Sequence, residues 1–441
     1  MSTAIQRYFT DARHPPIWHL VLGWVMLLPL LFFSTNGNLI PVSADPKVRI
    51  VAGGSEALSH RLPTALVIII CVTLILSRYQ LVLSMCRQAK VLLALPVLAL
   101  LSCLWSEDRQ QSVISAVILF VFTLFALYIA GSLSPQRQLE LVVFVGAIIL
   151  PLSIAVSIFL PNIGDTPTGW CGVLGDKNNL GMVATLLLVT LLHWQPHGIF
   201  QKVSRIAYVI MAAVLIVMSK SRGGWGLACL ALFLLGGLWL LQKMALLDSI
   251  AVALAAIPVL SGIGYAIYHF GPLLLQTVGK DPTLNQRTII WAAVWTAVTK
   301  RLLFGYGYCA FWTGLDGPSN NIVLIAGWAL RQAQDGFLDL WLQLGVFGVA
   351  LVVAAFAVAL RDIVRCFRGS RHRNYVRWSV IVLVCTFVYN IGESSLGLDR
   401  ISWLLFLVAC AGLRQIARAG QYHAPSSFSS QSEAIRMASM A

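Results

Sequence analysis

The sequence predicts an all-α polytopic membrane protein, with about twelve transmembrane helices and one large loop between them. Of the 441 residues, 58% are hydrophobic and 11% are charged, whereas a soluble globular chain is roughly a quarter charged. Apolar runs recur along almost the whole length. The exception is the stretch 271–336, in which glycine and polar residues interrupt the apolar ones. This pattern favours many membrane spans over one buried core.

Twelve apolar runs come close to the roughly 20 residues that a helix needs to cross the ~30 Å hydrocarbon core. They are residues 17–33, 62–76, 91–105, 113–130, 139–160, 180–194, 203–218, 224–241, 250–270, 337–360, 376–389 and 401–413. Four of them are short, namely 62–76, 91–105, 180–194 and 376–389. The number of spans is therefore accurate to about one or two.

The predicted spans divide the chain into four parts. Residues 1–270 hold spans one to nine, residues 271–336 form the loop, residues 337–420 hold the last three spans, and residues 421–441 form a polar tail. The tail is rich in Ser and Ala, and we expect it to be disordered. In the loop, residues 287–301 repeat apolar side chains at helical spacing. They predict an amphipathic helix, of a kind that can rest on a membrane surface.

The basic residues predict the orientation of the spans. An even number of spans places both termini on one side, and the loops on that side hold 18 of the 31 Lys and Arg residues but only 5 of the 17 acidic ones. Cytoplasmic loops carry such an excess of positive charge, so both termini are expected in the cytoplasm. The net charge of +14 is then a signal of topology and of contact with anionic lipids. No nucleic-acid partner is predicted.

Charged residues beside membrane spans are costly and are therefore functional candidates. On the outer side, Lys220 and Arg222 lie in a tight turn between two spans, with Gly223 and Gly224 after them. A basic residue at a membrane edge can simply extend its charged end into water. Two positive charges in a short outer loop, however, run against the cytoplasmic bias. A guanidinium in this place suits bidentate binding of a phosphate.

Three further outer residues extend this set. Lys177 and Asn178 stand at a predicted helix start, a position that favours an anion, although Lys177 can equally be an ordinary interfacial charge. Arg287 begins the amphipathic helix and can be merely its first-turn charge. Glu393, after the span 376–389, can be a helix cap or a partner for one of the cations. Together, at least three cations face one aqueous compartment beside a wide apolar surface, which suits a lipid-linked phosphate or pyrophosphate.

The sequence predicts neither a metal site nor a cofactor. The eight histidines form no cluster with the spacing of metal ligands. There is also no phosphate-binding loop of the Walker type and no dinucleotide fingerprint. A transfer reaction would therefore use a donor that is already activated, and a lipid pyrophosphate is such a donor.

An ordered set of motifs resembles the O-antigen ligase and polymerase superfamily, and most closely its exopolysaccharide-production branch. The matching segments are 172–181, 219–222, 286–291, 303–307, 336–339, 344–348 and 390–394. They keep the order of the family between about residues 168 and 413, whereas the first 160 residues match only as hydrophobic helices. No one motif is decisive, and it is the order of the set that is specific.

The resemblance implies an inner-membrane protein of twelve helices with a large periplasmic loop. It implies transfer of a glycan from undecaprenyl pyrophosphate to a sugar hydroxyl without a metal ion. By the same resemblance, Arg222 and Arg287 would bind the pyrophosphate and stabilise its developing charge.

The sequence departs from the family at one place. Relatives commonly have His-Asn before the Gly-Phe-Leu-Asp motif, and the His is a candidate base, but this chain has Gln334 and Asp335. Asp335, Asp339 or Glu393 can take the proton late in the reaction, or positioning of the two substrates supplies most of the rate.

The first hypothesis is a polymerase that joins undecaprenyl-pyrophosphate-linked repeat units into a surface polysaccharide or exopolysaccharide. The alternatives are a ligase that moves finished glycan onto a lipid A-core and, in a different class, a lipid-linked glycan transporter or flippase. Transporters often contain internal repeats, and none is visible in this sequence.

The expected partners are the lipid-linked glycan, membrane lipids, a glycan or lipid A-core acceptor, a flippase and a chain-length regulator. The candidates are Arg222, Arg287, Asp335 and Glu393 for catalysis, and Lys177, Asn178, Lys220, Gln334 and Asp339 for substrate binding.

Overall fold

The structure is a computed structural model of the whole chain. It describes residues 17–35, 56–245, 287–314, 317–327, 330–367, 371–398 and 400–422. The predicted span 250–270, the first part of the predicted loop and most of the predicted tail lie outside the described residues. The first two residues of that tail, Gln421 and Tyr422, end the last helix.

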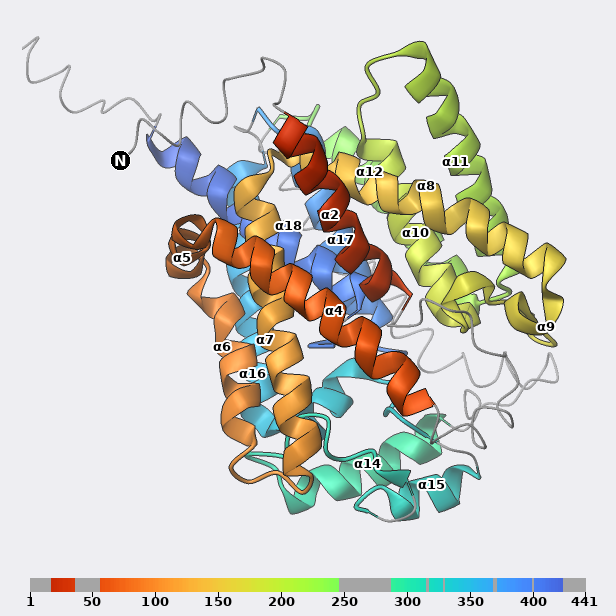
Figure 1. Cartoon of the computed structure of the whole chain (residues 1–441), viewed down its shortest axis with the longest axis vertical. Helices are drawn as coiled ribbons and strands as arrows, with labels where there is room; N and C mark the ends of the chain where they lie inside the picture. The colour runs from red at the N-terminus through yellow and green to blue at the C-terminus, as the bar shows by residue number, and fades with distance from the viewer. Residues whose placement is uncertain are drawn as a thin grey trace, which may run out of the picture.

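Helices make up nearly all of the regular structure (Figure 1), which confirms the all-α prediction. They are α2 (Ile17–Ser34), α4 (Glu56–Ser77), α5 (Tyr79–Gln88), α6 (Lys90–Ser102), α7 (Arg109–Ser132), α8 (Pro135–Phe159), α9 (Pro161–Gly164), α10 (Lys177–His193), α11 (Ile199–Met218), α12 (Arg222–Leu241), α14 (Arg287–Lys300), α15 (Asn320–Ala326), α16 (Gly336–Cys366), α17 (Arg373–Tyr389) and α18 (Ile401–Tyr422). A two-stranded antiparallel hairpin, β1 (Asp165–Thr166) and β2 (Gly169–Trp170), and a 3-10 turn, η1 (Gly172–Leu174), lie before α10.

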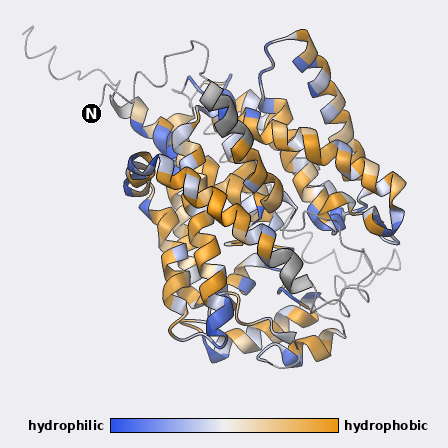
Figure 2. Cartoon of the chain, in the orientation of Figure 1, coloured by the Kyte–Doolittle hydropathy of each residue, from blue (hydrophilic) through white to orange (hydrophobic). Residues whose placement is uncertain are grey.

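Several of these helices are suited to cross a membrane. In the described part of the chain, 6 helices are long and apolar enough to cross a membrane: α7, α8, α11, α12, α16 and α18. The helices α4 and α5 are bent by 89° relative to each other, and if they form one span together, the number rises to 7. Figure 2 shows apolar residues on most faces of the long helices. A helix that is apolar all round is buried in protein or in lipid. The chain therefore fits a multi-pass membrane protein, while the number of twelve spans stays a prediction.

Side-chain caps fix where the helices next to the site begin. Asp176 caps α10 by accepting a hydrogen bond from the Asn179 amide, and Ser221 caps α12 through the Gly224 amide. Asp335 caps α16, and one of its oxygens accepts from two amides of the first turn. Each cap contributes roughly 1 kcal/mol and sets the first turn of its helix. Candidate site residues stand directly beside all three caps.

The 302–307 segment docks onto a kink in α16. Gly345 has a φ of 67° inside this helix, and a side chain there would collide with the Leu303 carbonyl. The Tyr306 and Gly307 amides donate to carbonyls of α16, at 2.8 and 3.0 Å, and the Val346 amide donates back to the Leu302 carbonyl at 3.0 Å. The kink therefore joins the large loop to the membrane-spanning bundle.

The predicted helix is confirmed as α14, but it is not amphipathic as expected, because apolar side chains such as Ile289 and Trp295 are exposed while others are buried. Its buried residues, Ile290, Val294 and Val298, pack into a second core with Phe311 and Ile322. This core is separate from the main one between the long helices. The face formed by Ile290, Val294 and Val298 is therefore covered by the protein itself and does not rest on the membrane.

The two ends of the bundle differ. In Figure 1, the start of α2 and the end of α18 lie toward the upper end, and α14 and α15 lie at the lower end.

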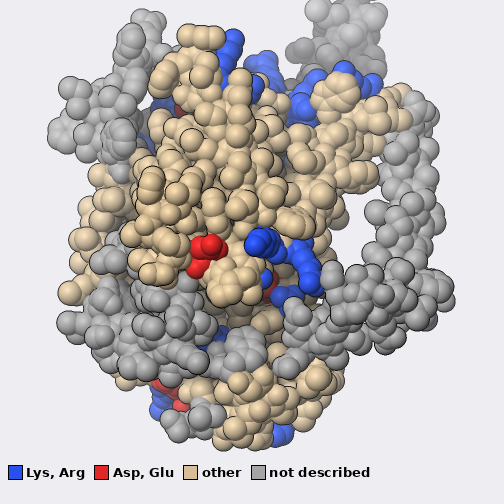
Figure 3. Space-filling model, turned by 90° about the vertical axis from the view of Figure 1, so that its right-hand side faces the viewer, with Lys and Arg blue, Asp and Glu red and all other residues tan. Residues whose placement is uncertain are grey.

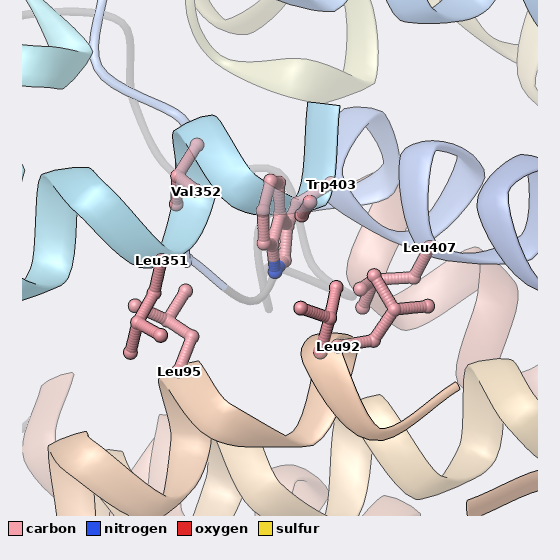
Figure 4. A pocket seen from close by; sticks show the side chains of 8 residues that line it. Leu92, Leu95, Leu351, Val352, Trp403 and Leu407 are labelled. Atoms are coloured by element: carbon pink, nitrogen blue, oxygen red, sulfur yellow. The ribbon is translucent and has the colours of Figure 1, made fainter. Parts of the chain in front are cut away.

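A small apolar pocket lies between α6, α16 and α18, and the indole nitrogen of Trp403 faces it (Figure 4). Its lining is Val91, Leu92, Leu95, Leu351, Val352, Ala355, Trp403 and Leu407. This pocket has no titratable side chain, so the polar cluster described next is the better candidate for chemistry.

Candidate functional site

Glu393 is the centre of the largest group of predicted site residues that the structure brings together. Its Oε1 accepts hydrogen bonds from Arg287 Nη2 and from Asn178 Nδ2, both at 2.9 Å. Its Oε2 accepts one from Gln332 Nε2 at 3.3 Å. One carboxylate thus joins the start of α14, the start of α10 and the segment before α16.

Three more hydrogen bonds extend this group. Ser221 Oγ donates to Asn178 Oδ1 at 2.9 Å, Arg287 Nε donates to Gln334 Oε1 at 3.0 Å, and Arg400 Nη2 donates to Gln332 Oε1 at 3.4 Å. We call the whole group the Glu393 network; its members are Asn178, Ser221, Arg287, Gln332, Gln334, Glu393 and Arg400. Its members come from five separate segments of the sequence, so they come into contact only in the folded protein.

Two hydrogen bonds hold the Arg287 guanidinium in one orientation and do not use its Nη1 atom. Nε binds Gln334, Nη2 binds Glu393, and within the described residues no acceptor is found for Nη1. Gly392 leaves room beside that atom, because a Cβ there would lie 2.9 Å from Nη1. The Arg287 side chain is 25% exposed. The remaining N–H groups are therefore oriented, on a side chain that is partly exposed.

Opposing effects act on the Glu393 carboxylate, whose side chain is 14% exposed. Burial raises the pKa of Glu393 above its ordinary value, and the nearby Asp176 adds to this, while Arg287 and Arg400 lower it. A partly buried ion pair is screened little by salt, and removal of one partner leaves the other uncompensated. The charge of Glu393 thus depends on the position of Arg287.

Asp335 stands beside the network without a hydrogen bond to it among those found in the described chain. Its Oδ1 accepts from the Phe337 and Leu338 amides at 2.9 Å, which fixes the start of α16. Burial raises the pKa of Asp335, and the two amides oppose the shift. The preceding Gln334 has a φ of 54°, in the left-handed region that few side chains adopt. Asp335 and this turn together direct Gln334 toward Arg287.

Asp339 lies apart from the network, inside the protein. Only 4% of it is exposed, and it accepts from Trp312 Nε1 at 2.6 Å, the Ala333 amide at 3.3 Å and Gln343 Nε2 at 3.3 Å. The Ala333 carbonyl accepts in turn from Trp291 Nε1 at 3.2 Å. Ala333 is thus held from both sides, between the two glutamines of the network. In this place Asp339 supports the segment that positions them.

The other predicted cations flank the network. Lys177, the first residue of α10, donates to the Thr168 carbonyl at 3.4 Å. Lys220 and Arg222 are exposed on either side of Ser221, and Lys220 has a φ of 50°. In the part of the chain that the structure describes, none of these three donates to the Glu393 network. Figure 3 shows basic side chains gathered at mid-height on one face of the molecule, with acidic side chains beside them.

We expect Lys177→Ala to reduce transfer only mildly, by about two- to fivefold. Its ammonium binds a backbone carbonyl outside the network, and one exposed ion contact is worth roughly 1 kcal/mol or less. The measurement is the transfer rate of the purified variant beside wild type. A complete loss of transfer, with the protein still folded, would show that Lys177 binds the substrate directly.

Sequence reasoning missed three members of the network, namely Ser221, Gln332 and Arg400. A usable signal existed for Arg400, because it is a cation beside a span on the outer side, as Arg222 is. Ser221 follows Lys220 directly and has the residue type of a helix cap. Gln332 carries no such signal, since a neutral amide in a loop is common.

The arrangement is suited to bind an oxyanion. Arg287 presents an oriented guanidinium edge, and Lys177 and Arg222 begin two helices whose amide ends also attract negative charge. Glu393 adds a carboxylate within reach of the same site. In such a site the cations can bind a phosphate group, and the carboxylate can accept and release a proton.

A comparison with protein families gives one match. Residues 206–353 match the family model described as O-antigen ligase, a range that includes Arg222, Arg287, Gln334, Asp335 and Asp339 but not Asn178 or Glu393. No curated protein matches the chain. Members of the matched family are ligases and polymerases of the glycosyltransferase type. This match supports membership of the chain in the O-antigen ligase and polymerase superfamily.

Proposed function

We propose that this protein polymerises undecaprenyl-pyrophosphate-linked oligosaccharide repeat units into a bacterial surface polysaccharide or exopolysaccharide. The observation that carries the proposal is the Arg287 guanidinium, which Gln334 and Glu393 orient and whose Nη1 has no acceptor among the described residues. It stands in a network with the start of α12, where Arg222 is exposed. Such a pair of cations suits the two phosphates of a pyrophosphate.

In the proposed reaction, the acceptor sugar hydroxyl attacks the anomeric carbon of the donor. The bond from that carbon to the pyrophosphate oxygen breaks, and the lipid pyrophosphate leaves with the electron pair. Arg287 and Arg222 offset the negative charge that develops on the leaving oxygen. Preorganised charge of this kind is usually the largest contribution to catalysis. Neither a metal nor a cofactor takes part in the proposal.

We place the reaction at the periplasmic face of the inner membrane. The start of α2 and the end of α18 lie toward one end of the bundle, and α14 and α15 lie at the other (Figure 1). The excess of Lys and Arg in the loops on the terminal side supports a cytoplasmic position for both termini. With this orientation, Arg287 at the start of α14 faces the periplasm. The lipid-linked glycan, membrane lipids and a glycan acceptor are the partners of the reaction, and a flippase and a chain-length regulator would act before and beside it.

A ligase that transfers finished glycan to a lipid A-core is the second candidate, favoured by the description of the matched family as O-antigen ligase. Both enzymes break the same donor bond and differ in the acceptor. Analysis of glycans from cells that lack the protein separates the two. A polymerase knockout makes only short-chain glycan, and a ligase knockout leaves complete chains on the lipid carrier. Unchanged glycans in the knockout would contradict both assignments.

A further inference from the structure

The carboxylate of Glu393 occupies the position on Arg287 that an oxyanion ligand would take. Its Oε1 lies 2.9 Å from Arg287 Nη2, with 14% of the Glu393 side chain exposed. Carboxylate and phosphate bind a guanidinium through the same N–H groups. A pyrophosphate that binds both edges of Arg287 must therefore displace Glu393 from Nη2.

Assuming the proposed function, we propose that Glu393 yields Arg287 to the pyrophosphate of the donor and then accepts the proton of the acceptor hydroxyl. Glu393 is then both the counter-ion of the resting site and the catalytic base. One carboxylate thus links donor binding to activation of the acceptor.

Two hydrogen bonds that do not involve Arg287 keep Glu393 in place when Arg287 turns toward the pyrophosphate. Asn178 Nδ2 remains on Oε1 and Gln332 Nε2 on Oε2, and Arg400 supports Gln332. The carboxylate therefore stays at the site but loses its closest cation. The pyrophosphate that replaces it on Arg287 brings negative charge close to Glu393.

The groups around Glu393 determine how its proton affinity responds. They are Arg287 from α14, Asp176 beside α10, Tyr389 from α17 and Arg400 from its own loop. Burial already raises the pKa of Glu393, and Arg287 lowers it. Transfer of Arg287 to the pyrophosphate removes the lowering contact and adds a like charge, so the pKa rises further. A carboxylate with a raised pKa is a better general base near neutral pH.

The proton balance of the step is simple. The O–H bond of the acceptor breaks, and the proton moves to Glu393 while the acceptor oxygen bonds to the anomeric carbon. The bond from that carbon to the pyrophosphate breaks, and the lipid pyrophosphate leaves with the electron pair. Glu393 then releases the proton to water and pairs again with Arg287, which returns the site to its resting state.

Glu393 is better placed for this role than the two other carboxyl groups considered. The Oδ1 of Asp335 caps α16, and among the described residues that carboxylate has no hydrogen bond or ion pair with Arg287. Asp339 is enclosed by Trp312, Ala333 and Gln343. Among the described carboxylates, Glu393 therefore combines contact with Arg287 and access to the site.

The test is Glu393→Gln in the full-length protein. Glutamine keeps an oxygen for Arg287 and Asn178, but it has no charge and does not accept the proton. We expect the transfer kcat to fall by about 10²- to 10⁴-fold, the usual contribution of a general base. Undecaprenyl pyrophosphate should bind equally or more tightly, because its competitor for Arg287 has lost its charge. Glu140→Gln, which changes a carboxylate bonded to Gln136, is the matched control and should behave as wild type.

Two outcomes would overturn the role of Glu393. If the Glu393→Gln protein transfers within about threefold of the wild-type rate, Glu393 is not the catalytic base. A variant that loses binding of undecaprenyl pyrophosphate shows that Glu393 only positions Arg287. Both outcomes leave the proposed function intact, whereas absence of transfer by the wild type contradicts the function itself.

The wild-type enzyme gives an independent test through pH, which does not depend on the folding of a variant. The kcat should fall as the pH drops through the raised pKa of Glu393, because the protonated carboxyl is no longer a base. Donor affinity should rise over the same range, because protonation neutralises the competitor of the pyrophosphate. A pyrophosphate esterified at both ends has no ionisation in this range, so the trend in affinity reports on the protein. If kcat and affinity fall together, or neither changes, the exchange of Arg287 does not occur.

Discussion

Arg287→Ala should abolish polysaccharide formation while the protein level stays normal. This guanidinium is the cation that the structure orients most strongly, through Nε to Gln334 and Nη2 to Glu393. Loss of one preorganised donor to developing negative charge typically costs about 10²- to 10³-fold in rate. The alanine variant also leaves Glu393 with its carboxylate charge uncompensated at the site. The measurement is the transfer rate of purified variants, together with their amount in the membrane.

Two matched variants sharpen this test. Lys300→Ala removes an exposed cation at the other end of α14 and should leave the rate within about twofold. Arg287→Lys should restore only part of the activity, because an ammonium cannot reproduce the planar contacts to Gln334 and Glu393 together. If Arg287→Ala makes normal product, pyrophosphate binding by Arg287 is wrong.

Arg222→Ala should have an effect of similar size, for a different reason. Arg222 begins α12, is exposed and has no ion pair within the described residues. Its removal therefore breaks no side-chain hydrogen bond or ion pair among the described residues, so a loss of activity reports on the bound substrate. We expect a fall of about 10²-fold or more in transfer, with thermal stability unchanged.

The control for Arg222 is Lys243→Ala, which removes an exposed cation just beyond the other end of α12. It should transfer at close to the wild-type rate. If Arg222→Ala and Lys243→Ala are equally active, Arg222 is an ordinary charge at the membrane edge, as its exposed position also allows.

Most of the helices could be predicted from the sequence, because long apolar runs leave few alternatives in a bilayer. Every predicted span within the described residues coincides with a helix. The docking of residues 302–307 on the kink at Gly345 could not be predicted. It depends on backbone hydrogen bonds between α16 and a segment about forty residues earlier, for which side-chain patterns give no signal.

The site could be predicted as a set of residues but not as an arrangement. The rule that charges beside spans are functional found Arg287 and Glu393, which lie 106 residues apart and form an ion pair. The resemblance, not this rule, placed Asp339 among the substrate-binding residues, and that role stays a prediction. The sequence did not show that protein donors surround this carboxylate, since its burial depends on the packing of Trp312 and Ala333 around it.

The structure also separated residues that the sequence had grouped. Lys177, Lys220 and Arg222 have the same charge and the same predicted side as Arg287, yet within the described chain only Arg287 joins Glu393. Distances between loops depend on helix packing, which no local pattern contains. The contact of Asn178 with Glu393, over 215 residues, is the clearest example.

The most direct test of the central claim is transfer by the purified protein in detergent, with an undecaprenyl-pyrophosphate-linked repeat unit as the sole substrate and without nucleotide or added metal. Products are separated by chain length, and the released lipid pyrophosphate is measured. We expect chains to grow and one lipid pyrophosphate to appear for each bond formed, with both signals absent in Arg287→Ala. Binding of the donor by the wild type without chain growth or release of the lipid would contradict the assignment as a polymerase.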